Sequence, residues 1–291
     1  MTSLRDLAEL VRAPAALSVP GDAVAGAAAG GALGAGTAGL SAAAVCLYWA
    51  GMAANDWADR ELDAKERPER PVPSGRVSPG TALGVAAGLS AAGLALAGLA
   101  GGRRALAVAV PLAGAVWAYD VALKDTPAGP AAMAACRGLD VMLGAAARPK
   151  GWRRAVLPAL TVAAHTYTVT ALSRREVSGG DRLLPAATLA GTAGVALAAA
   201  GMPAGARDRA PRARLSRGLA GWYAAGYGAP QVRALATPDA GSMRAAVRAG
   251  ITGLPALQGS LIARSAGLLP AAAVAACAPL GQALARRVSP T

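Results

Sequence analysis

The sequence predicts an all-α fold, a polytopic transmembrane bundle of about nine helices around a central cavity with a polar mouth. The first observation is the composition: 54% of the 291 residues are hydrophobic and only 15% are charged, whereas about 25% are charged in an average soluble protein. The second is the pattern, because the charged residues gather in short clusters between apolar runs of roughly 18 to 22 residues, which is the length needed to cross a hydrocarbon core about 30 Å thick. These runs lack the regular polar positions of amphipathic surface helices, which disfavours the alternative of an Ala-rich soluble helical protein.

The apolar runs predict nine membrane spans within one domain that covers residues 1–291. In chain order, the predicted spans lie near 12–30, 36–57, 79–100, 103–120, 128–147, 154–173, 183–201, 214–235 and 266–286. A tenth stretch, 242–262, is ambiguous. It contains Arg244, Arg248 and Gln258, so we expect it to be short, tilted or re-entrant.

Short charged clusters separate the predicted spans and carry most of the formal net charge of +13. Their arginines lie between apolar runs and not along one helix face, so we interpret them as membrane-flanking anchors and, in a few cases, as phosphate ligands. A nucleic-acid partner is therefore not expected. The two sides of the membrane would carry similar numbers of basic residues, so charge does not predict the orientation. We expect a multi-pass protein of the cell membrane, surrounded by membrane lipid.

The cysteines and the N-terminal segment argue against two other classes of protein. Cys46, Cys136 and Cys277 lie inside apolar runs without close pairing, so we expect buried thiols and neither a disulfide framework nor a zinc site. Asp6 and Glu9 precede the first long apolar run, and this segment does not have the character of a cleaved signal peptide.

The densest charged segment follows the second predicted span directly. Asp56, Asp59 and Asp63 are spaced i, i+3, i+7, and Asn55 lies one turn before Asp59. On a helix these side chains would share one face, where three like charges repel one another. Mg²⁺ would explain the spacing, because it prefers oxygen ligands and is usually held by one or two carboxylates plus substrate phosphate. The alternative is a solvated helix end whose carboxylates are neutralised by the basic side chains between them.

A rigid basic loop follows the acidic residues. Arg67 and Arg70 each precede a proline, and Pro73-Ser74-Gly75 predicts a turn. Guanidinium groups suit bidentate contacts with phosphate. Acidic residues followed by two candidate phosphate ligands therefore indicate a metal-bridged diphosphate site.

These two segments also resemble a known family. N-D-x-x-D-x-x-x-D over Asn55 to Asp63, R-P-x-R-P-x-P-S-G over Arg67 to Gly75, and Ser78 are similar to the first aspartate-rich motif of the UbiA superfamily of intramembrane prenyltransferases. The resemblance implies a nine-helix bundle and residues that hold Mg²⁺ bound to an isoprenyl diphosphate. The catalytic and metal-binding residues implied here are Asn55, Asp56, Asp59 and Asp63.

A second polar cluster, Ala118 to Pro130, lies between two predicted spans. It contains Tyr119, Asp120 and Lys124 and resembles the family's Tyr-to-Lys segment. The resemblance implies that Lys124 contacts diphosphate. The alternative is an ordinary interfacial loop with an aromatic anchor.

Two charged residues lie inside the next predicted span. Arg137 and Asp140 occupy the segment C-R-G-L-D, and charges within a membrane span are rare and often functional. Arg137 is a candidate diphosphate ligand. Because the two residues are one helical turn apart, a structural ion pair between them is equally open.

The place of the family's second aspartate motif departs from the pattern. Between His165 and Arg182 the acidic residues are Glu176 and Asp181, and Arg174 and Arg175 precede them. This suggests that one Mg²⁺ is retained, with Glu176 as a further candidate ligand, and that arginines replace the second ion as counter-charge. Together with the Y-D-x-x-L-K-x-T-P-x-G-P and C-R-G-L segments, this altered motif resembles the EboC-like branch of the superfamily.

His165 is the only histidine in the chain. In the middle of an apolar span we expect a hydrogen-bonded structural residue, with catalysis as a general base as the alternative. Most aromatic residues lie near predicted span ends and are expected to form interfacial belts, although one of them could steady an allylic cation. These residues are Tyr48, Trp49, Trp57, Trp117, Trp152, Trp222, Tyr223 and Tyr227.

The function that these observations favour is Mg²⁺-dependent prenyl transfer from an isoprenyl diphosphate to an aromatic or other small lipophilic acceptor. The first alternative is a non-catalytic isoprenoid- or lipid-binding, or precursor-exporting, membrane protein of the same fold, which the altered second motif favours. The second is another lipid-headgroup enzyme such as a CDP-alcohol phosphotransferase, whose D-G-x-x-A-R pattern is absent from the sequence. The donor length and the acceptor do not follow from the sequence.

Overall fold

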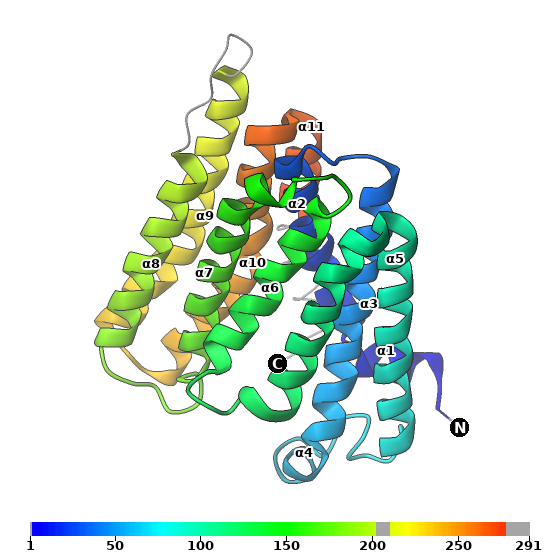
Figure 1. The fold of residues 1–291 in the computed structure, drawn as a ribbon. Helices are drawn as coiled ribbons and strands as arrows, with labels where there is room; N and C mark the ends of the chain where they lie inside the picture. The colour runs from blue at the N-terminus through cyan, green and yellow to red at the C-terminus, as the bar shows by residue number, and fades with distance from the viewer. Residues whose placement is uncertain (1, 202–209, 278–291) are drawn as a thin grey trace.

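The computed structural model describes residues 2–201 and 210–277, and within these ranges the chain forms helices and no strands. The long helices lie side by side in one bundle (Figure 1). In chain order the helices are α1 (Leu4–Leu10), η1 (Ala13–Ser18), α2 (Val19–Gly30), α3 (Ala35–Ala58), α4 (Arg60–Glu66), α5 (Pro79–Ala118), η2 (Tyr119–Leu123), α6 (Gly129–Ala145), α7 (Trp152–Ser173), α8 (Leu183–Ala200), α9 (Ala210–Ala236), α10 (Ala240–Ala266) and α11 (Leu268–Ala275).

The element α5 is two helices joined by a kink at Gly102. Gly102 has φ 63°, a conformation that glycine adopts at little steric cost. The chain turns back there, since Trp117 Nε1 donates to Ser90 Oγ at 3.0 Å, whereas a straight helix would separate residues 27 positions apart by about 40 Å. The two predicted spans at 79–100 and 103–120 are thus confirmed as separate helices.

Small residues allow α2 and α6 to cross at very short range. A Cβ atom on Gly26 would lie 1.7 Å from the carbonyl oxygen of Val141, and one on Gly144 would lie 1.8 Å from that of Ala23. No side chain fits between these backbones. Such small-residue contacts are typical of helix association in membranes, where close backbone approach replaces the hydrophobic effect.

Four helical segments are long and apolar enough to cross a membrane by length and composition alone. They are Ala35–Ala58, Pro79–Leu123, Trp152–Ser173 and Leu183–Ala200. The second of these contains the kink at Gly102 and so holds two predicted spans. The expected number of about nine spans is not confirmed by this criterion.

Three predicted spans differ from the observed helices. The span at 12–30 begins with the short 3₁₀ helix η1, so the regular helix α2 has only 12 residues. The ambiguous stretch 242–262 lies within α10, a continuous helix of 27 residues, so the expectation of a short or re-entrant segment is wrong. Of the span at 266–286, the described part forms α11, and residues 278–286 lie outside the described residues.

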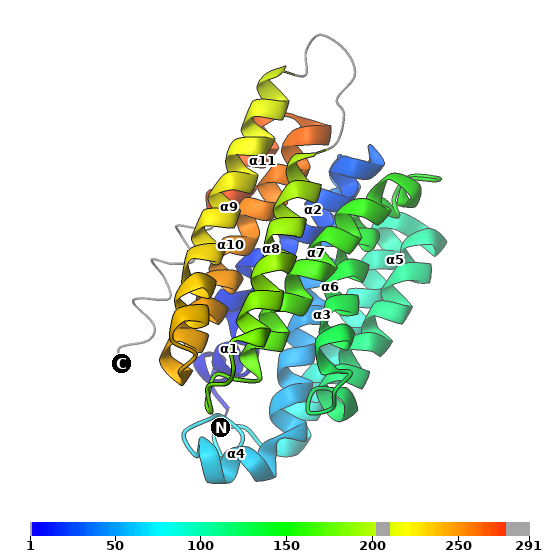
Figure 2. The same ribbon diagram turned by 90° about the vertical axis from the view of Figure 1, so that its left-hand side faces the viewer.

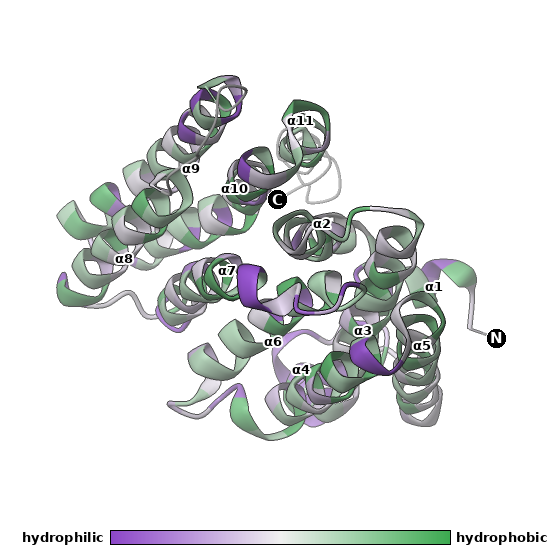
Figure 3. Cartoon of the chain, turned by 45° about the horizontal axis from the view of Figure 1, so that its top comes forward, coloured by the Kyte–Doolittle hydropathy of each residue, from purple (hydrophilic) through white to green (hydrophobic). Residues whose placement is uncertain are grey.

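One end of the bundle gathers the polar loops, and we call this end the mouth. The helix α4, the η2–α6 loop and the α7–α8 loop all lie there in both side views (Figures 1 and 2). Arg174 joins two of these loops, because its guanidinium donates to the carbonyls of Thr126 and Asp125. Hydrophilic colour is concentrated in loops and at helix ends, while the helices themselves are mostly apolar (Figure 3).

Candidate active site

The acidic residues that follow the second span are carried by two helices that meet at Asp59. The helix α3 ends directly before Asp59, whose amide donates to the carbonyl of Asn55 at 2.9 Å, and α4 begins directly after it. Asp56 therefore lies on α3 and Asp63 on α4. The expectation that these side chains share one face of a single helix is wrong, because the helix breaks in the middle of the motif.

Asp56 and Asp63 nevertheless face the same cation. Arg70 Nη1 lies 2.6 Å from an oxygen of Asp63 and 3.6 Å from an oxygen of Asp56. Arg67 lies 3.7 Å from the other oxygen of Asp63, and Arg12 donates to Asp56 at 3.0 Å. Both carboxylates are almost fully buried, where an unpaired charge would be costly. The basic loop thus folds back over the acidic residues, as the order of the two segments predicted.

The second polar cluster completes the mouth. Asn55 Nδ2 donates a hydrogen bond to Asp120 Oδ1 at 3.3 Å. Lys124 Nζ donates a hydrogen bond to a carboxylate oxygen of Asp59, with which it forms an ion pair. Asp120 lies on η2 (Tyr119–Leu123), and Lys124 follows it directly. The element η2 is a single π-helical turn. Such turns frequently occur at functional sites. This turn brings Asp120 and Lys124 against the end of α3.

The donor atoms at the mouth suit Mg²⁺ in kind, although they are not gathered into a cage. Within residues 2–201 and 210–277, no group of three or more His, Cys, Asp or Glu residues lies close enough to hold a metal ion. Mg²⁺ does not need such a group, since it is usually bound by one or two carboxylates, waters and substrate phosphate. The buried oxygens of Asp56 and Asp63, which contact the same nitrogen of Arg70, fit that requirement.

The α7–α8 loop also faces the mouth, but it does not bring a further carboxylate into the cluster. Burial raises the pKa of Glu176, and the nearby charges of Arg244 and Arg67 oppose this rise. The backbone carbonyl of Glu176 accepts a bond of 2.8 Å from Arg244. Glu176 belongs to no described group of three metal-binding residues.

Comparison with known proteins decides the family. The model of the UbiA prenyltransferase family matches residues 17–206, which include both polar clusters of the mouth and the altered second motif. The chain belongs to the UbiA prenyltransferase family. It is accordingly an integral membrane protein with the all-helical fold of that family.

Curated relatives of this UbiA family member are digeranylgeranylglyceryl phosphate synthases. The synthase of Methanopyrus kandleri is 42% identical over 86 residues, which cover 30% of this chain and 31% of the relative. That of Methanothrix thermoacetophila is 64% identical over 33 residues, 11% of this chain and 12% of the relative. The chain matches about a third or less of the length of these relatives.

Two solved structures share the fold along most of the chain. A structure from work on the biosynthesis of digeranylgeranylglyceryl phosphate synthase in membranes superposes with a TM-score of 0.66 at 15% identity, over 91% of this chain and 99% of the other. The apo structure of a UbiA homolog from Aeropyrum pernix K1 gives a TM-score of 0.64 at 20% identity, over 85% and 96%. At these identities the similarity establishes the fold alone.

Arg137 of this UbiA family member is paired deep in the bundle. Its Nε lies 2.8 Å from Asp22 of α2, and Gln258 of α10 donates to the other oxygen of Asp22 at 2.6 Å. Of the two roles left open for Arg137, the structure favours structural pairing. The partner is Asp22 and not the expected Asp140, whose Oδ1 has no hydrogen-bond partner among the described residues. We call Asp22, Arg137 and Gln258 the inner cluster.

His165 has the surroundings of a structural residue. It is 2% exposed, and its Nδ1 lies 2.9 Å from the hydroxyl of Tyr223. The rings of Tyr223 and Tyr227 both meet the imidazole edge-on, at centroid distances of 5.3 and 5.5 Å. These two tyrosines are buried inside the bundle, so their assignment to an interfacial belt is wrong. Trp152 and Trp222 are exposed, as that assignment requires.

Four residues of these clusters were not among the predicted site residues, namely Arg12, Asp22, Asp120 and Gln258. Arg12 was interpreted only as a charge that flanks the first span, and Asp120 only as part of a polar segment. Asp22 could have been found, because it is an acidic residue inside the predicted span 12–30, and buried charges in membranes need partners. No signal in the sequence alone would have joined Arg12 to Asp56, since 44 residues separate them.

Proposed function

We propose that this UbiA family member transfers a prenyl group from an isoprenyl diphosphate to a lipophilic acceptor in an Mg²⁺-dependent reaction at the mouth. One observation carries the proposal: buried carboxylates and basic side chains contact each other there in alternation, so the same small region offers ligands for a divalent cation and for a diphosphate. Asp56 and Asp63 contact Arg12, Arg67 and Arg70 in this way. Asp59 and Lys124 repeat the arrangement.

The basic side chains would bind and orient the diphosphate. Arg67 and Arg70 follow one another on a short loop, and forked guanidinium groups match the oxygens of a phosphate. Lys124 would add a third positive charge from η2. Their present partners are carboxylates, so binding of the donor would exchange one set of oxygens for another without leaving buried charges unpaired.

The carboxylates would then bind the Mg²⁺ ion. Mg²⁺ held by Asn55, Asp56, Asp59 and Asp63 would supply neutralising charge for the departing diphosphate. The allylic C–O bond breaks, the diphosphate leaves with the electron pair, and the acceptor atom bonds to the allylic carbon and loses its proton. The basic residues stabilise the charge that develops on the leaving group, and the apolar bundle keeps water from the reactive carbon.

The acceptor class is supported by the relatives. The names of these relatives include a glyceryl phosphate, so a lipid alcohol is a natural candidate beside the aromatic acceptors considered from the sequence. The altered α7–α8 loop and the C-R-G-L segment support placement near the EboC-like branch. The second candidate function is a non-catalytic isoprenoid- or lipid-binding protein, which is favoured because neither Glu176 nor Asp181 of that loop joins a group of three metal-binding residues in the described part of the chain.

Pyrophosphate release distinguishes these functions. Protein purified in detergent should release pyrophosphate from geranylgeranyl diphosphate when Mg²⁺ and an acceptor are supplied. Asp56→Asn and Asp59→Asn should abolish release, because each removes a charge at the mouth. Arg60→Gln is the matched control, since the Arg60 guanidinium donates to the carbonyl of Trp57 and not to these carboxylates. Tight binding of the diphosphate without turnover across a broad acceptor screen would favour the non-catalytic function.

A further inference from the structure

The end of the bundle opposite the mouth, which we call the far end, carries an unbalanced charge. The α2–α3 loop, the kink of α5 and the α6–α7 loop meet there (Figure 1). A Cβ atom on Gly101 of the kink would lie 3.8 Å from the Cα atom of Ala147, and Arg148 donates to the carbonyl of Gly31. The kink, the α6–α7 loop and the start of α7 carry six basic residues, which we call the far-end patch: Arg103, Arg104, Arg148, Lys150, Arg153 and Arg154.

The sequence supplies no carboxylate to offset these charges. Residues 23–55, 70–119 and 141–175 form the three segments and the helices that lead to them, and they contain no Asp or Glu. Outside the part of the chain that the structure describes, the single acidic residue is Asp208. It would offset one of the six charges at most, so the far-end patch keeps a large positive excess.

The contacts of the far-end patch are with neutral groups. All six members are exposed, and none of them forms an ion pair with any of residues 2–201 and 210–277. Arg148 donates to a backbone carbonyl, and the guanidinium of Arg153 lies 5.5 Å from the centre of the Trp152 ring. The positive charges are therefore available to a partner outside the chain.

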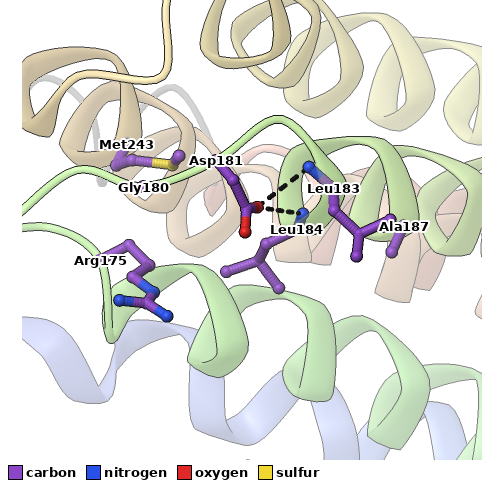
Figure 4. Close-up of a pocket in the computed structure, with 7 residues that line it drawn as sticks. All are labelled: Arg175, Gly180, Asp181, Leu183, Leu184, Ala187 and Met243. Carbon is purple, nitrogen blue, oxygen red and sulfur yellow. Dashed lines mark hydrogen bonds between the residues drawn. The ribbon is translucent and has the colours of Figure 1, made fainter.

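The mouth shows how the same protein balances charge elsewhere. Arg70 lies 2.6 Å from an oxygen of Asp63. Even in the α7–α8 loop, which lies outside that cluster, Arg175 and Asp181 line the same cavity (Figure 4). A group of basic residues without an acidic neighbour is thus a property of the far end and not of both ends of the bundle.

The far-end patch also surrounds the positive end of a helix. The helix α7 begins at Trp152, and Arg153 and Arg154 occupy its first turn, which contains no acidic residue. This part of the molecule is strongly hydrophilic in Figure 3, where the far end comes forward. Aligned peptide dipoles place positive charge at a helix N-terminus, so cations in the first turn are unfavourable. An anion bound there would relieve this repulsion and the repulsion between the neighbouring cations.

The apolar surface next to the patch places it at the level of the lipid headgroups. The helix α7 is long and apolar enough to cross a membrane, and its exposed side chains Val156, Leu157 and Leu160 follow the patch within about two turns. Leu99, which is 86% exposed, precedes the kink of α5. Trp152 is 51% exposed at the helix end, where aromatic residues mark the boundary between hydrocarbon and headgroups.

From these observations we infer that the far-end patch binds anionic phospholipids, with its basic side chains on the phosphates and the acyl chains against the outer face of α7. Clustered basic residues at a membrane surface attract lipids of net negative charge, and guanidinium groups match phosphate oxygens. A zwitterionic lipid brings no net charge to offset the six cations. A general membrane anchor would not discriminate between these lipids, whereas this surface does. The inference does not depend on the chemistry at the mouth.

Lipid selectivity tests this inference on the full chain. The protein is incubated in a neutral detergent with equal amounts of phosphatidylglycerol and phosphatidylcholine that have the same acyl chains, and bound lipids are counted by native mass spectrometry. Phosphatidylglycerol should be retained over phosphatidylcholine by about tenfold, and Arg153→Gln with Arg154→Gln should lower this ratio by at least about fivefold. The control is Arg182→Gln with Arg233→Gln, which removes two exposed arginines at the mouth end and should keep the ratio. A ratio near one for the unmodified protein, or an equal fall in both double variants, would overturn the inference.

Thermal unfolding separates lipid binding from a structural role of the same arginines. Without lipid, the variant Arg153→Gln with Arg154→Gln should melt at the same temperature as the unmodified protein or higher, because repulsion at the start of α7 is relieved. Phosphatidylglycerol should stabilise the unmodified protein more than this variant, and phosphatidylcholine should affect both equally. A variant that melts at a lower temperature without lipid would assign the arginines to the fold and overturn the inference. Selectivity that disappears when sodium phosphate replaces sodium chloride at equal ionic strength would indicate a site for free phosphate and would also overturn it.

Discussion

The mouth and the inner cluster use the same chemistry in different surroundings. In both, an arginine meets a buried aspartate: Arg67 meets Asp63 at the mouth, and Arg137 meets Asp22 inside the bundle. The side chain of Arg67 is 52% exposed, whereas that of Arg137 is 10% exposed and Asp22 is fully buried. A half-exposed cation can exchange its carboxylate partner for a ligand. A buried cation cannot do so without leaving a buried carboxylate unpaired. The mouth is therefore suited to binding, and the inner cluster to holding α2, α6 and α10 together.

The largest expected effect is on the inner cluster. Arg137→Met removes the partner of Asp22 and should destabilise the fold by about 3–5 kcal/mol, the usual cost of breaking a buried ion pair. Thermal unfolding in detergent measures this loss. The double variant Asp22→Leu with Arg137→Met should recover much of the stability, because both charges are then gone. An unchanged melting temperature in the single variant would remove the distinction between the two clusters.

The matching change at the mouth should affect function and spare stability. Arg67→Gln removes a half-exposed ion pair, which contributes about 0–1 kcal/mol, while the lost contact with the leaving group should lower kcat/KM by roughly 10²-fold. Steady-state pyrophosphate release and thermal unfolding, measured on the same preparation, separate the two effects. A variant that unfolds early and turns over normally when folded would reverse the proposed roles.

His165 is buried inside the bundle, as the inner cluster is, so we expect its replacement to affect stability more than catalysis. His165→Phe leaves the Tyr223 hydroxyl without its partner and should cost about 1–3 kcal/mol of stability. If His165 only supports the fold, kcat should change little, whereas removal of a general base would cost roughly 10²–10⁴-fold. Thermal unfolding together with kcat at a temperature well below the transition tests both expectations. A large fall in kcat with normal stability would revive the catalytic alternative.

The smallest effect concerns the helix α1, which is attached to the mouth by ion pairs. Arg76 contacts Glu9 at 2.7 Å and Asp6 at 2.9 Å. Hydrogen bonds from Ser3 and then the contact with Arg76 lower the pKa of Asp6 to about 2, and Arg76 lowers that of Glu9. Both pKa values are depressed on folding, so the stabilisation is present above the ordinary values of 3.8 and 4.5 and is lost as the pH falls from there toward about 2.

A fluorophore on Leu4→Cys reports this attachment, since Leu4 is exposed. In a background where Cys46, Cys136 and Cys277 are replaced by alanine, its anisotropy should fall as the pH is lowered through that window. The same label combined with Arg76→Gln should already show low anisotropy at neutral pH. Anisotropy that does not depend on pH in either protein would mean that these pairs do not hold α1.

The sequence predicted what depends on neighbouring residues. The apolar runs at 79–100 and 103–120 were predicted to be two spans, and the kink at Gly102 does separate two helices there. The basic loop was expected to serve the same site as the acidic residues, and Arg70 does contact both Asp56 and Asp63. Short-range order along the chain was sufficient for these conclusions.

The rest depended on packing between distant segments. The helix α3 ends directly before Asp59, although the sequence around it predicts one continuous helix. The carboxylate of Asp59 accepts a hydrogen bond from Lys124, which is 65 positions away. Polar residues made α10 look interrupted, yet Gln258 donates to Asp22 from the other end of the chain, 236 positions away. Such distant residues supply the hydrogen-bond and ion-pair partners of polar groups inside an apolar span. The sequence of the span itself does not show which residues these partners are.

Calorimetric titration of the full protein with geranylgeranyl diphosphate, with and without Mg²⁺, measures whether the mouth binds a metal-bound diphosphate. We expect binding heat that requires Mg²⁺ and that is lost in Asp56→Asn and Asp63→Asn, while thermal unfolding shows that both variants remain folded. Equal heat in the presence of EDTA, or unchanged binding by both folded variants, would contradict this expectation.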